Sequence, residues 1–335
     1  MNDKIKISFP VDAVYLWVDG SDPQWLSKKR EVVGGLKGES AQLRDDVAAV
    51  GRFADNGELK YSLRSLSLYA PWIRNVYIVT DNQSPAWINQ DKIRLVDHQD
   101  IFPRNAVLPS FNSHAIELCI HRIKGLSEQF LLFNDDIFLG SPMDREDVFR
   151  KNGDPVLWVL KKRKKYKSKL ISEEYMQKNA HRGADAHARR LVLETYGRYL
   201  PYRVRHYPKP MLRSVIAEIW NTFPKEVERT LSGHFRKPND LGIFTFFTFY
   251  MIAAKNIHPR GINGPRLLLD YLSRRLRHVT ATAGGKKFSK RLMQIQKHKP
   301  VTFCLNDGER SSEQHRKATK QFLSAYFPHK CVFEK

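Results

Sequence analysis

Short apolar runs alternate with segments of helical spacing over the first 150 residues. The apolar runs have the length and composition of buried strands and lie at 12–18, 75–80, 93–97 and 130–133. Leucines at i, i+4 and i+7 predict a helix over 58–69 that ends before Pro71, and Ser113 and Gly125 bracket a second helix. This alternation predicts an α/β fold built on a largely parallel sheet flanked by helices.

Acidic side chains follow several of the predicted strands. Asp19 and Asp22 follow the first strand, Asp81 follows the second, and Asp135 and Asp136 follow the fourth. Ligands of open α/β sheets bind at the carboxyl ends of the strands, so these carboxylates are expected to gather at one site. Aspartate is also common in turns, and each residue alone is compatible with a turn role. The glycine-rich phosphate loops of dinucleotide-binding and P-loop proteins are absent from the sequence.

The pattern changes after residue 150. A basic run occupies 161–169, and helices are predicted at 173–200, at 211–231 and, packed on the sheet, at 242–254. The basic segment 267–276 has an amphipathic face, which fits either a helix on a membrane surface or a helix packed on its own domain.

The charge is unevenly distributed along the 335 residues. Residues 1–150 carry 18 basic and 21 acidic side chains, whereas residues 151–335 carry 39 basic and 14 acidic ones. A basic excess of this kind indicates a polyanionic partner, which could be a nucleic acid, an acidic membrane or a phosphate-rich substrate. Apolar residues make up 41% of the chain, which excludes a disordered protein. We expect three parts, at 1–150, 151–259 and 260–335.

Three cysteines, Cys119, Cys304 and Cys331, are too few and too scattered for a disulfide framework or a thiolate zinc site, which favours a reducing compartment. The N-terminus lacks an apolar signal-peptide core. The longest apolar run, 242–254, is shorter than the roughly 20 residues that span a bilayer. A cytoplasmic location is therefore expected, with peripheral contact on the inner face of an anionic membrane left open.

Four groups of residues carry a family resemblance, in the same order along the chain. They are DAVYLWVDGSD at 12–22, a long block from ELKYSLRS to FNDD at 58–136, HYPKPMLR at 206–213 with FRKPND at 235–240, and FCLND at 303–307. These segments resemble the conserved regions of the Stealth proteins, a family of sugar-1-phosphate transferases that includes bacterial capsule polymerases and an animal N-acetylglucosamine-1-phosphotransferase.

The resemblance implies a compact bacterial capsular or exopolysaccharide phosphotransferase. The expected donor is a UDP-N-acetylhexosamine, the acceptor an oligosaccharide or polysaccharide that is free or lipid-linked, and the products a phosphodiester and UMP. The implied fold is glycosyltransferase-A-like, or Rossmann-like, with the nucleotide-sugar and a metal bound by 1–150, the site completed by 151–259, and the fourth region in a basic C-terminal part. His114 stands where the family pattern has a small residue or proline. This difference bears on the expected acceptor or sugar pocket and not on the expected reaction.

The carboxylates are the expected ligands of Mg²⁺ or Mn²⁺, because hard cations prefer oxygen donors. Asp135, Asp136 and Asp307 are the candidates, with Asn134 as a neutral substrate-binding neighbour. Adjacent side chains in extended backbone point to opposite sides. One of the paired aspartates is therefore expected to meet the metal and the other to orient a hydroxyl group; Asp136 is a candidate both as a metal ligand and as a catalytic residue.

His206 is the candidate for proton transfer, because imidazole gains and loses a proton near neutral pH; the sequence leaves open whether it acts as base, acid or nucleophile. Arg236 is expected to neutralise charge on the transferred phosphoryl group, and Arg213 and Arg64 to bind the donor.

The loop after the first strand is also expected to bind substrate. Trp17 could stack on uridine or belong to the core, Gly20 permits close backbone approach, and Asp19 and Asp22 supply carboxylates.

Two alternatives use the same features differently. A metal-dependent glycosyltransferase would share the strand-end carboxylates and release UDP, but the segments around His206 and Arg236 disfavour it. A basic nucleic-acid-binding protein would interleave aromatic and basic side chains on one surface. Acidic strand ends oppose that, so no nucleic-acid partner is expected.

Overall fold

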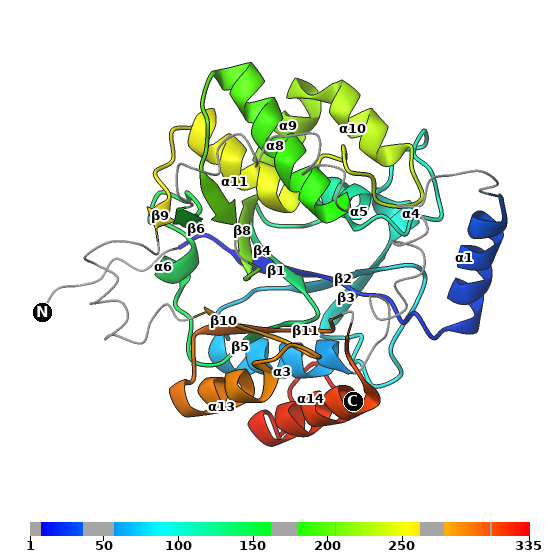
Figure 1. The fold of residues 1–335 in the computed structure, drawn as a ribbon, viewed down its shortest axis with the longest axis vertical. Helices are drawn as coiled ribbons and strands as arrows, with labels where there is room; N and C mark the ends of the chain where they lie inside the picture. The colour runs from blue at the N-terminus through cyan, green and yellow to red at the C-terminus, as the bar shows by residue number, and fades with distance from the viewer. Residues whose placement is uncertain (1–7, 36–56, 162–179, 205, 262–277, 309) are drawn as a thin grey trace, which may run out of the picture.

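A five-stranded sheet forms the centre of the computed structural model, which describes residues 8–35, 57–161, 180–204, 206–261, 278–308 and 310–335 (Figure 1). In spatial order its strands are β3 (Ile93–Asp97), β2 (Val76–Thr80), β1 (Val11–Leu16), β4 (Gln129–Asn134) and β8 (Lys209–Leu212). The first four are parallel and β8 runs antiparallel to β4. The predicted largely parallel sheet is confirmed.

Helices cover both faces of this sheet because side chains alternate along each buried strand. Val14 of β1 packs in the cluster formed with α5, α8, α9 and α11, whereas Ala13 and Tyr15 pack in the cluster on the opposite face with α3. The helices of the first face are α5 (Ser113–Cys119), α8 (Ala180–Tyr196), α9 (Arg213–Thr222), α10 (Pro224–Leu231) and α11 (Ile243–Ala253). On the other face, α3 (Glu58–Tyr69) has the predicted bounds.

A second sheet joins the C-terminal part of the chain to the first. It contains β10 (His278–Thr282), β11 (Thr302–Asn306) and β5 (Ile137–Leu139), and β5 follows β4 after a turn formed by Asp135 and Asp136. The rings of Phe138 and Phe303 stack across this sheet with centroids 5.0 Å apart. Two helices, α13 (Phe288–His298) and α14 (Glu313–Tyr326), cover its outer face (Figure 1).

The remaining described elements lie outside these two sheets and the helices that cover them. They are α1 (Pro23–Gly35), α4 (His98–Ile101), the 3₁₀ turn η2 (Ile120–Arg122), α6 (Arg145–Val148), and a small sheet of β7 (Tyr202–Val204), β6 (Trp158–Lys161) and β9 (Arg260–Gly261).

Several sequence predictions need adjustment. The prediction of a helix at 211–231 was wrong at its start, because residues 211 and 212 complete the edge strand β8. The rest of this segment forms two helices, α9 and α10, which are divided at Phe223. Most of the basic run 161–169, the first residues of the helix expected at 173–200 and nearly all of the amphipathic segment 267–276 lie outside the described residues. Among the described helices, none is long and apolar enough to cross a membrane.

Candidate active site

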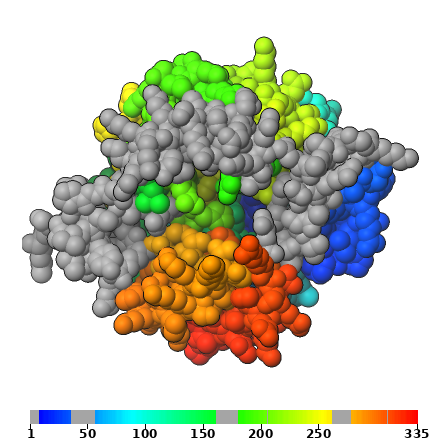
Figure 2. Space-filling model, in the orientation of Figure 1, coloured from blue at the N-terminus to red at the C-terminus, as the bar shows by residue number. Residues whose placement is uncertain are grey.

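A cavity of about 970 Å³ opens at the carboxyl ends of the central strands. Trp17 follows β1, Val79 is near the end of β2, and Asn134, Asp135 and Asp136 end β4, so that three neighbouring strands deliver residues to its wall. Figure 2 shows a hollow between the C-terminal part, in orange and red, and the helices in green. This is the position at which open α/β sheets bind their ligands.

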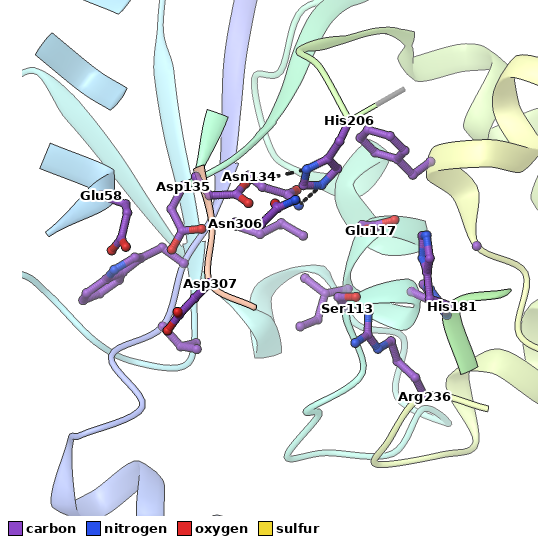
Figure 3. Close-up of a pocket in the computed structure, with 18 of the residues that line it drawn as sticks. Glu58, Ser113, Glu117, Asn134, Asp135, His181, His206, Arg236, Asn306 and Asp307 are labelled. Carbon is purple, nitrogen blue, oxygen red and sulfur yellow. Dashed lines mark hydrogen bonds and ion pairs between the residues drawn. The ribbon is translucent and has the colours of Figure 1, made fainter. Parts of the chain in front are cut away.

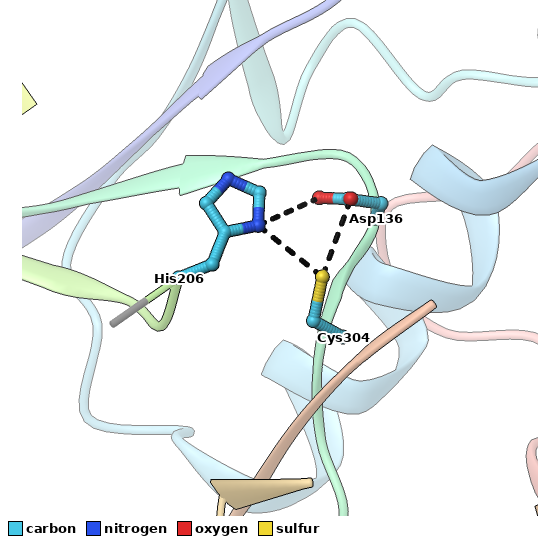
Figure 4. A group of neighbouring side chains, drawn as sticks. All are labelled: Asp136, His206 and Cys304. Atoms are coloured by element: carbon cyan, nitrogen blue, oxygen red, sulfur yellow. Dashed lines mark hydrogen bonds and ion pairs between the residues drawn. The ribbon is translucent and has the colours of Figure 1, made fainter. Parts of the chain in front are cut away.

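His206 lies in the cavity and its imidazole contacts residues from both sheets. The side-chain amide nitrogen of Asn134 is 2.7 Å from Nε2. On the other ring nitrogen, Nδ1 is 3.2 Å from the Sγ atom of Cys304 and 3.9 Å from the Oδ1 atom of Asp136 (Figure 4). In the tautomer in which the Asn134 amide donates to Nε2, the ring proton is on Nδ1, on the side of Cys304 and Asp136. The ring of Phe244 packs beside the imidazole with centroids 5.6 Å apart.

The paired aspartates point to different parts of the cavity. Asp135 lies with Asp307 and Glu58 on one side, whereas the carboxylate of Asp136 meets His206 (Figures 3 and 4). Asp307 accepts a hydrogen bond from the Nε atom of Arg316 at Oδ2, and its buried Oδ1 has no hydrogen-bond partner. The structure therefore places Asp135, Asp136 and Asp307 on the wall of one cavity, with Asp136 beside His206.

The opposite wall carries Glu117, which the sequence analysis missed. It faces the cavity together with Ser113, His181 and Arg236 (Figure 3). Burial raises the pKa of Glu117 to about 7, so the carboxyl group can exchange a proton near neutral pH. The signal in the sequence was an acidic residue within an apolar helical stretch, since its neighbours in α5 are buried in the core.

Lys209 lies behind this wall in β8 and is fully buried. Its Nζ atom is 4.0 Å from the ring centroid of Phe244 and 3.5 Å from the hydroxyl of Thr248. Burial lowers the pKa of Lys209 well below its ordinary value, so the amine is stabilised in its neutral form.

Two glycine-containing loops of the C-terminal part close the cavity beside Asp307. Gly284 has a φ of +76°, and a Cβ atom there would overlap the carbonyl oxygen of Arg310. A Cβ at Gly308 would likewise overlap the carbonyl of Ala283. The loops therefore pack backbone against backbone and bring Lys286 and the Arg310 side chain to the cavity, which the sequence analysis also missed.

The loop after β1 reaches the cavity only through its first residues. Trp17 lines the cavity and is 5% exposed. The carboxylate of Asp19 accepts hydrogen bonds from the backbone and hydroxyl of Ser21, and Asp22 caps α1 by accepting from the backbone of Trp25. Gly20 lies in the turn between them and, like both aspartates, is outside the cavity wall.

Two of the expected donor-binding arginines lie elsewhere. The guanidinium of Arg64 is buried against Glu334 and the carbonyl of Phe327, which gives it a structural contact in place of the predicted one. Arg213 begins α9, is half-exposed, and has its Nε atom 3.9 Å from Glu128. Arg236, by contrast, lines the cavity.

His114, which departs from the family pattern, also lines the cavity. Its Nδ1 atom is 3.3 Å from the Oδ2 atom of Asp240, which also accepts a hydrogen bond from the side-chain amide of Asn112. A Cβ atom at Gly242 would lie 3.6 Å from the ring, which is ordinary van der Waals contact.

The comparisons with known proteins identify the family of the chain. The four models of Stealth conserved regions match in order: region 1 at residues 9–37, region 2 at 52–157, region 3 at 205–253 and region 4 at 293–335. They include every residue described above around His206, from Asn134 to Cys304. The chain belongs to the Stealth family.

Several curated relatives align with almost the whole chain. A capsular polysaccharide phosphotransferase of Haemophilus influenzae is 32% identical over 95% of this chain and 84% of its own length, and one of Aeromonas hydrophila is 31% identical over 98% and 87%. An exopolysaccharide phosphotransferase of Streptomyces coelicolor is 36% identical over 98% of this chain. The chain spans only 53% of that relative and 33% of another from the same organism.

Similar solved structures are more distant. A crystal structure of the galactosyltransferase LgtC with donor and acceptor sugar analogues has a TM-score of 0.44 and 10% sequence identity over 96% of each chain. The glycosyltransferase GlyE of Streptococcus pneumoniae has a TM-score of 0.40 and 9% identity, over 95% of this chain and 62% of GlyE.

Proposed function

We propose that this protein transfers a hexose 1-phosphate, of the N-acetylhexosamine class, from a UDP-sugar to a hydroxyl group of a polysaccharide acceptor. The observation that carries the proposal is the position of His206 in the strand-end cavity, held between Asn134 and Asp136, in a chain whose relatives are named polysaccharide phosphotransferases. The acceptor oxygen forms a bond to the β-phosphorus, and the bond from that phosphorus to the bridging oxygen breaks. UMP leaves, and the hydroxyl proton passes to a base.

His206 and Asp136 are the groups placed to handle that proton. Asp136 faces Nδ1, so it stabilises positive charge on the imidazole when the ring takes up a proton at Nε2. The side-chain amide of Asn134 lies against the same nitrogen, and rotation of the amide would free Nε2 to take up the proton and present the carbonyl oxygen to the N–H group that forms. Glu117 on the opposite wall, with its pKa of about 7, is a second group able to exchange a proton near neutral pH.

Cationic side chains around the cavity would neutralise the phosphate groups. Arg236 lies on the wall with Glu117, and Lys286 and Arg310 lie on the loops beside Asp307. Guanidinium groups pair with phosphate oxygens in two-pronged fashion and stay charged, which suits charge developing during phosphoryl transfer. Trp17, at the end of β1, supplies an aromatic surface beside this part of the cavity.

The acidic side of the cavity fits a hard divalent cation. Asp135 and Asp307 supply carboxylate oxygens, and the buried Oδ1 atom of Asp307 lacks a hydrogen-bond partner. Mg²⁺ or Mn²⁺ bound there would supply neutralisation of pyrophosphate charge. The excess of basic residues after position 150 would favour a polyanionic product, or an anionic membrane carrying a lipid-linked acceptor.

The test is to identify the nucleotide that is released. Purified protein is incubated with a capsule-type oligosaccharide, Mg²⁺ or Mn²⁺ and a panel of UDP-hexoses and UDP-N-acetylhexosamines, and UMP is separated from UDP. We expect UMP together with a phosphodiester product, and a loss of about 10²–10⁴-fold in rate for His206→Ala. His329→Ala, which changes an exposed histidine of the C-terminal segment, is the matched control. Release of UDP with transfer of the sugar alone would instead establish a metal-dependent glycosyltransferase.

A further inference from the structure

Three different metal-binding groups converge at His206. The Nδ1 atom of His206 and the Sγ atom of Cys304 are 3.2 Å apart, Sγ is 3.3 Å from the Oδ2 atom of Asp136, and Nδ1 is 3.9 Å from Oδ1 of the same carboxylate (Figure 4). In tetrahedral zinc sites the bonds are about 2.0–2.3 Å long, which separates neighbouring ligand atoms by roughly 3.3–3.6 Å. Two of the three distances are close to these values and the third is a few tenths of an ångström longer, so small side-chain movements would bring the three groups to the corners of such a site.

We propose that Asp136, His206 and Cys304 bind one Zn²⁺ ion, with water as the fourth ligand, and that this ion inhibits the enzyme. A thiolate and an imidazole select zinc over magnesium, which prefers oxygen ligands alone. Asp135 and Asp307, the residues proposed for the hard cation, lie on another side of the cavity. The proposed zinc site therefore differs in its ligands from the site proposed for magnesium.

Both Cys304 and His206 must release a proton to a bound metal. Burial, and then the neighbouring Asp136 and Asp135 carboxylates, raise the pKa of the Cys304 thiol well above its ordinary value, so the thiol keeps its proton until a metal binds. In the metal-free protein the thiol lies 3.0 Å from the Oδ1 atom of Asn306, which accepts from the S–H group. As the S–Zn bond forms, the S–H bond breaks and its proton passes to solvent. As the N–Zn bond forms, the ring proton leaves Nδ1 and Nε2 takes up a proton from solvent, so that the imidazole stays neutral.

An ion can reach this group from the cavity. The side chains of His206 and Asp136 are 34% and 21% exposed, whereas Cys304 is buried behind them. A bound Zn²⁺ would occupy Nδ1 and the Asp136 carboxylate, and in the proposed reaction this pair stabilises the positive charge that forms when Nε2 takes up the proton. Inhibition thus rests on the proposed function, but zinc binding does not.

Binding is tested on the full chain, stripped of metal with a chelator and titrated with Zn²⁺ against a fluorescent zinc indicator. We expect one tight site per chain, and a loss of affinity of at least about 100-fold for Cys304→Ser, since second-sphere changes alone cost 10–100-fold. Cys331→Ser removes a thiol from the C-terminal segment and should leave the affinity unchanged. Circular dichroism and thermal melting establish that both variants are folded.

Cobalt substitution reports the sulfur ligand directly. Co²⁺ should give a thiolate-to-metal charge-transfer band in the wild type and in Cys331→Ser, and no such band in Cys304→Ser. Zinc affinity that is equal in wild type and Cys304→Ser, or cobalt binding without the band, would overturn the site. If the site is present, micromolar Zn²⁺ should abolish UMP formation and a chelator followed by Mg²⁺ should restore it. Binding of zinc without inhibition would overturn the inhibitory role, whereas UDP release in the absence of zinc would refute the proposed function and leave the binding result standing.

Discussion

Arg64 and Glu334 are separated by 270 positions in the chain and form a buried, two-pronged ion pair. The Nε and Nη2 atoms of Arg64 are 2.7 and 2.8 Å from the two carboxylate oxygens of Glu334. A third donor of Arg64, Nη1, binds the carbonyl oxygen of Phe327. The pair ties the end of the chain to α3, and α3 packs on the central sheet. Arg64 thereby stabilises the position of the fourth conserved region, which supplies Cys304 and Asp307 to the cavity.

Removal of Arg64 should destabilise the protein. In Arg64→Ala the Glu334 carboxylate, whose side chain is 1% exposed, loses its main partner, and we expect the free energy of unfolding to fall by about 3–5 kcal/mol. Lys60→Ala is the control, because Lys60 meets the same carboxylate from a more exposed position and should cost about 1 kcal/mol or less. Urea denaturation measures both. If Arg64→Ala left the stability unchanged and raised the KM for the donor, Arg64 would have the substrate-binding role predicted from the sequence.

Glu117 should make stability depend on pH. Burial raises its pKa from 4.5 to about 7, so between these values the folded state keeps a proton that the unfolded state has lost. The free energy of unfolding therefore falls as pH rises through this interval, by on the order of 3 kcal/mol. Glu117→Gln lacks this contribution. Urea denaturation at pH 4 and pH 8 should show a larger loss for the wild type than for Glu117→Gln, and equal losses would contradict the assignment.

Lys209 should have the opposite pH dependence. Burial depresses its pKa in the folded state, so between the folded-state pKa and the ordinary value of 10.5 the unfolded state binds the extra proton, and stability falls as pH decreases across this interval. Lys209→Met keeps a similar volume without a titrating group. We expect this variant to be about 1–3 kcal/mol more stable than the wild type at neutral pH, with the gap narrowing as pH rises toward 10.5. Thermal and urea unfolding across pH test this, and a less stable variant would show that the amine is charged and paired.

Gly284 should be intolerant of a side chain. An alanine there would have to adopt a φ of +76° and would overlap the backbone of Arg310, so we expect a loss of about 1–3 kcal/mol. Because the same loops carry Lys286, the KM for the nucleotide-sugar should also rise. Gly34→Ala, in a helix where a Cβ atom has open space, should be neutral or slightly stabilising. A Gly284→Ala protein with wild-type stability and KM would show that the two loops can separate.

Long, regular patterns in the sequence were sufficient to predict the central architecture. Strands β1, β2, β3 and β4 and helix α3 were predicted because each is a continuous apolar run or a leucine repeat. The short strands β5 and β8 were not predicted, because three or four residues are too few to show a periodic pattern of apolar positions. Asp22, in the loop before α1, was predicted to bind substrate, whereas in the structure it caps that helix. The sequence does not distinguish the two roles, because helix caps and ligand-binding residues are drawn from the same residue types.

The sequence by itself determined the α/β class, the family and the strand-end position of Asn134, Asp135 and Asp136, because local apolar periodicity and contiguous motifs are enough for these. Only the tertiary structure decided which side chains meet. Cys304 lies beside His206, 98 positions away, because β11 pairs with β5, and Arg64 is turned away from the cavity by Glu334. Such contacts depend on strand pairing and burial between distant segments, and no local pattern along the chain records them.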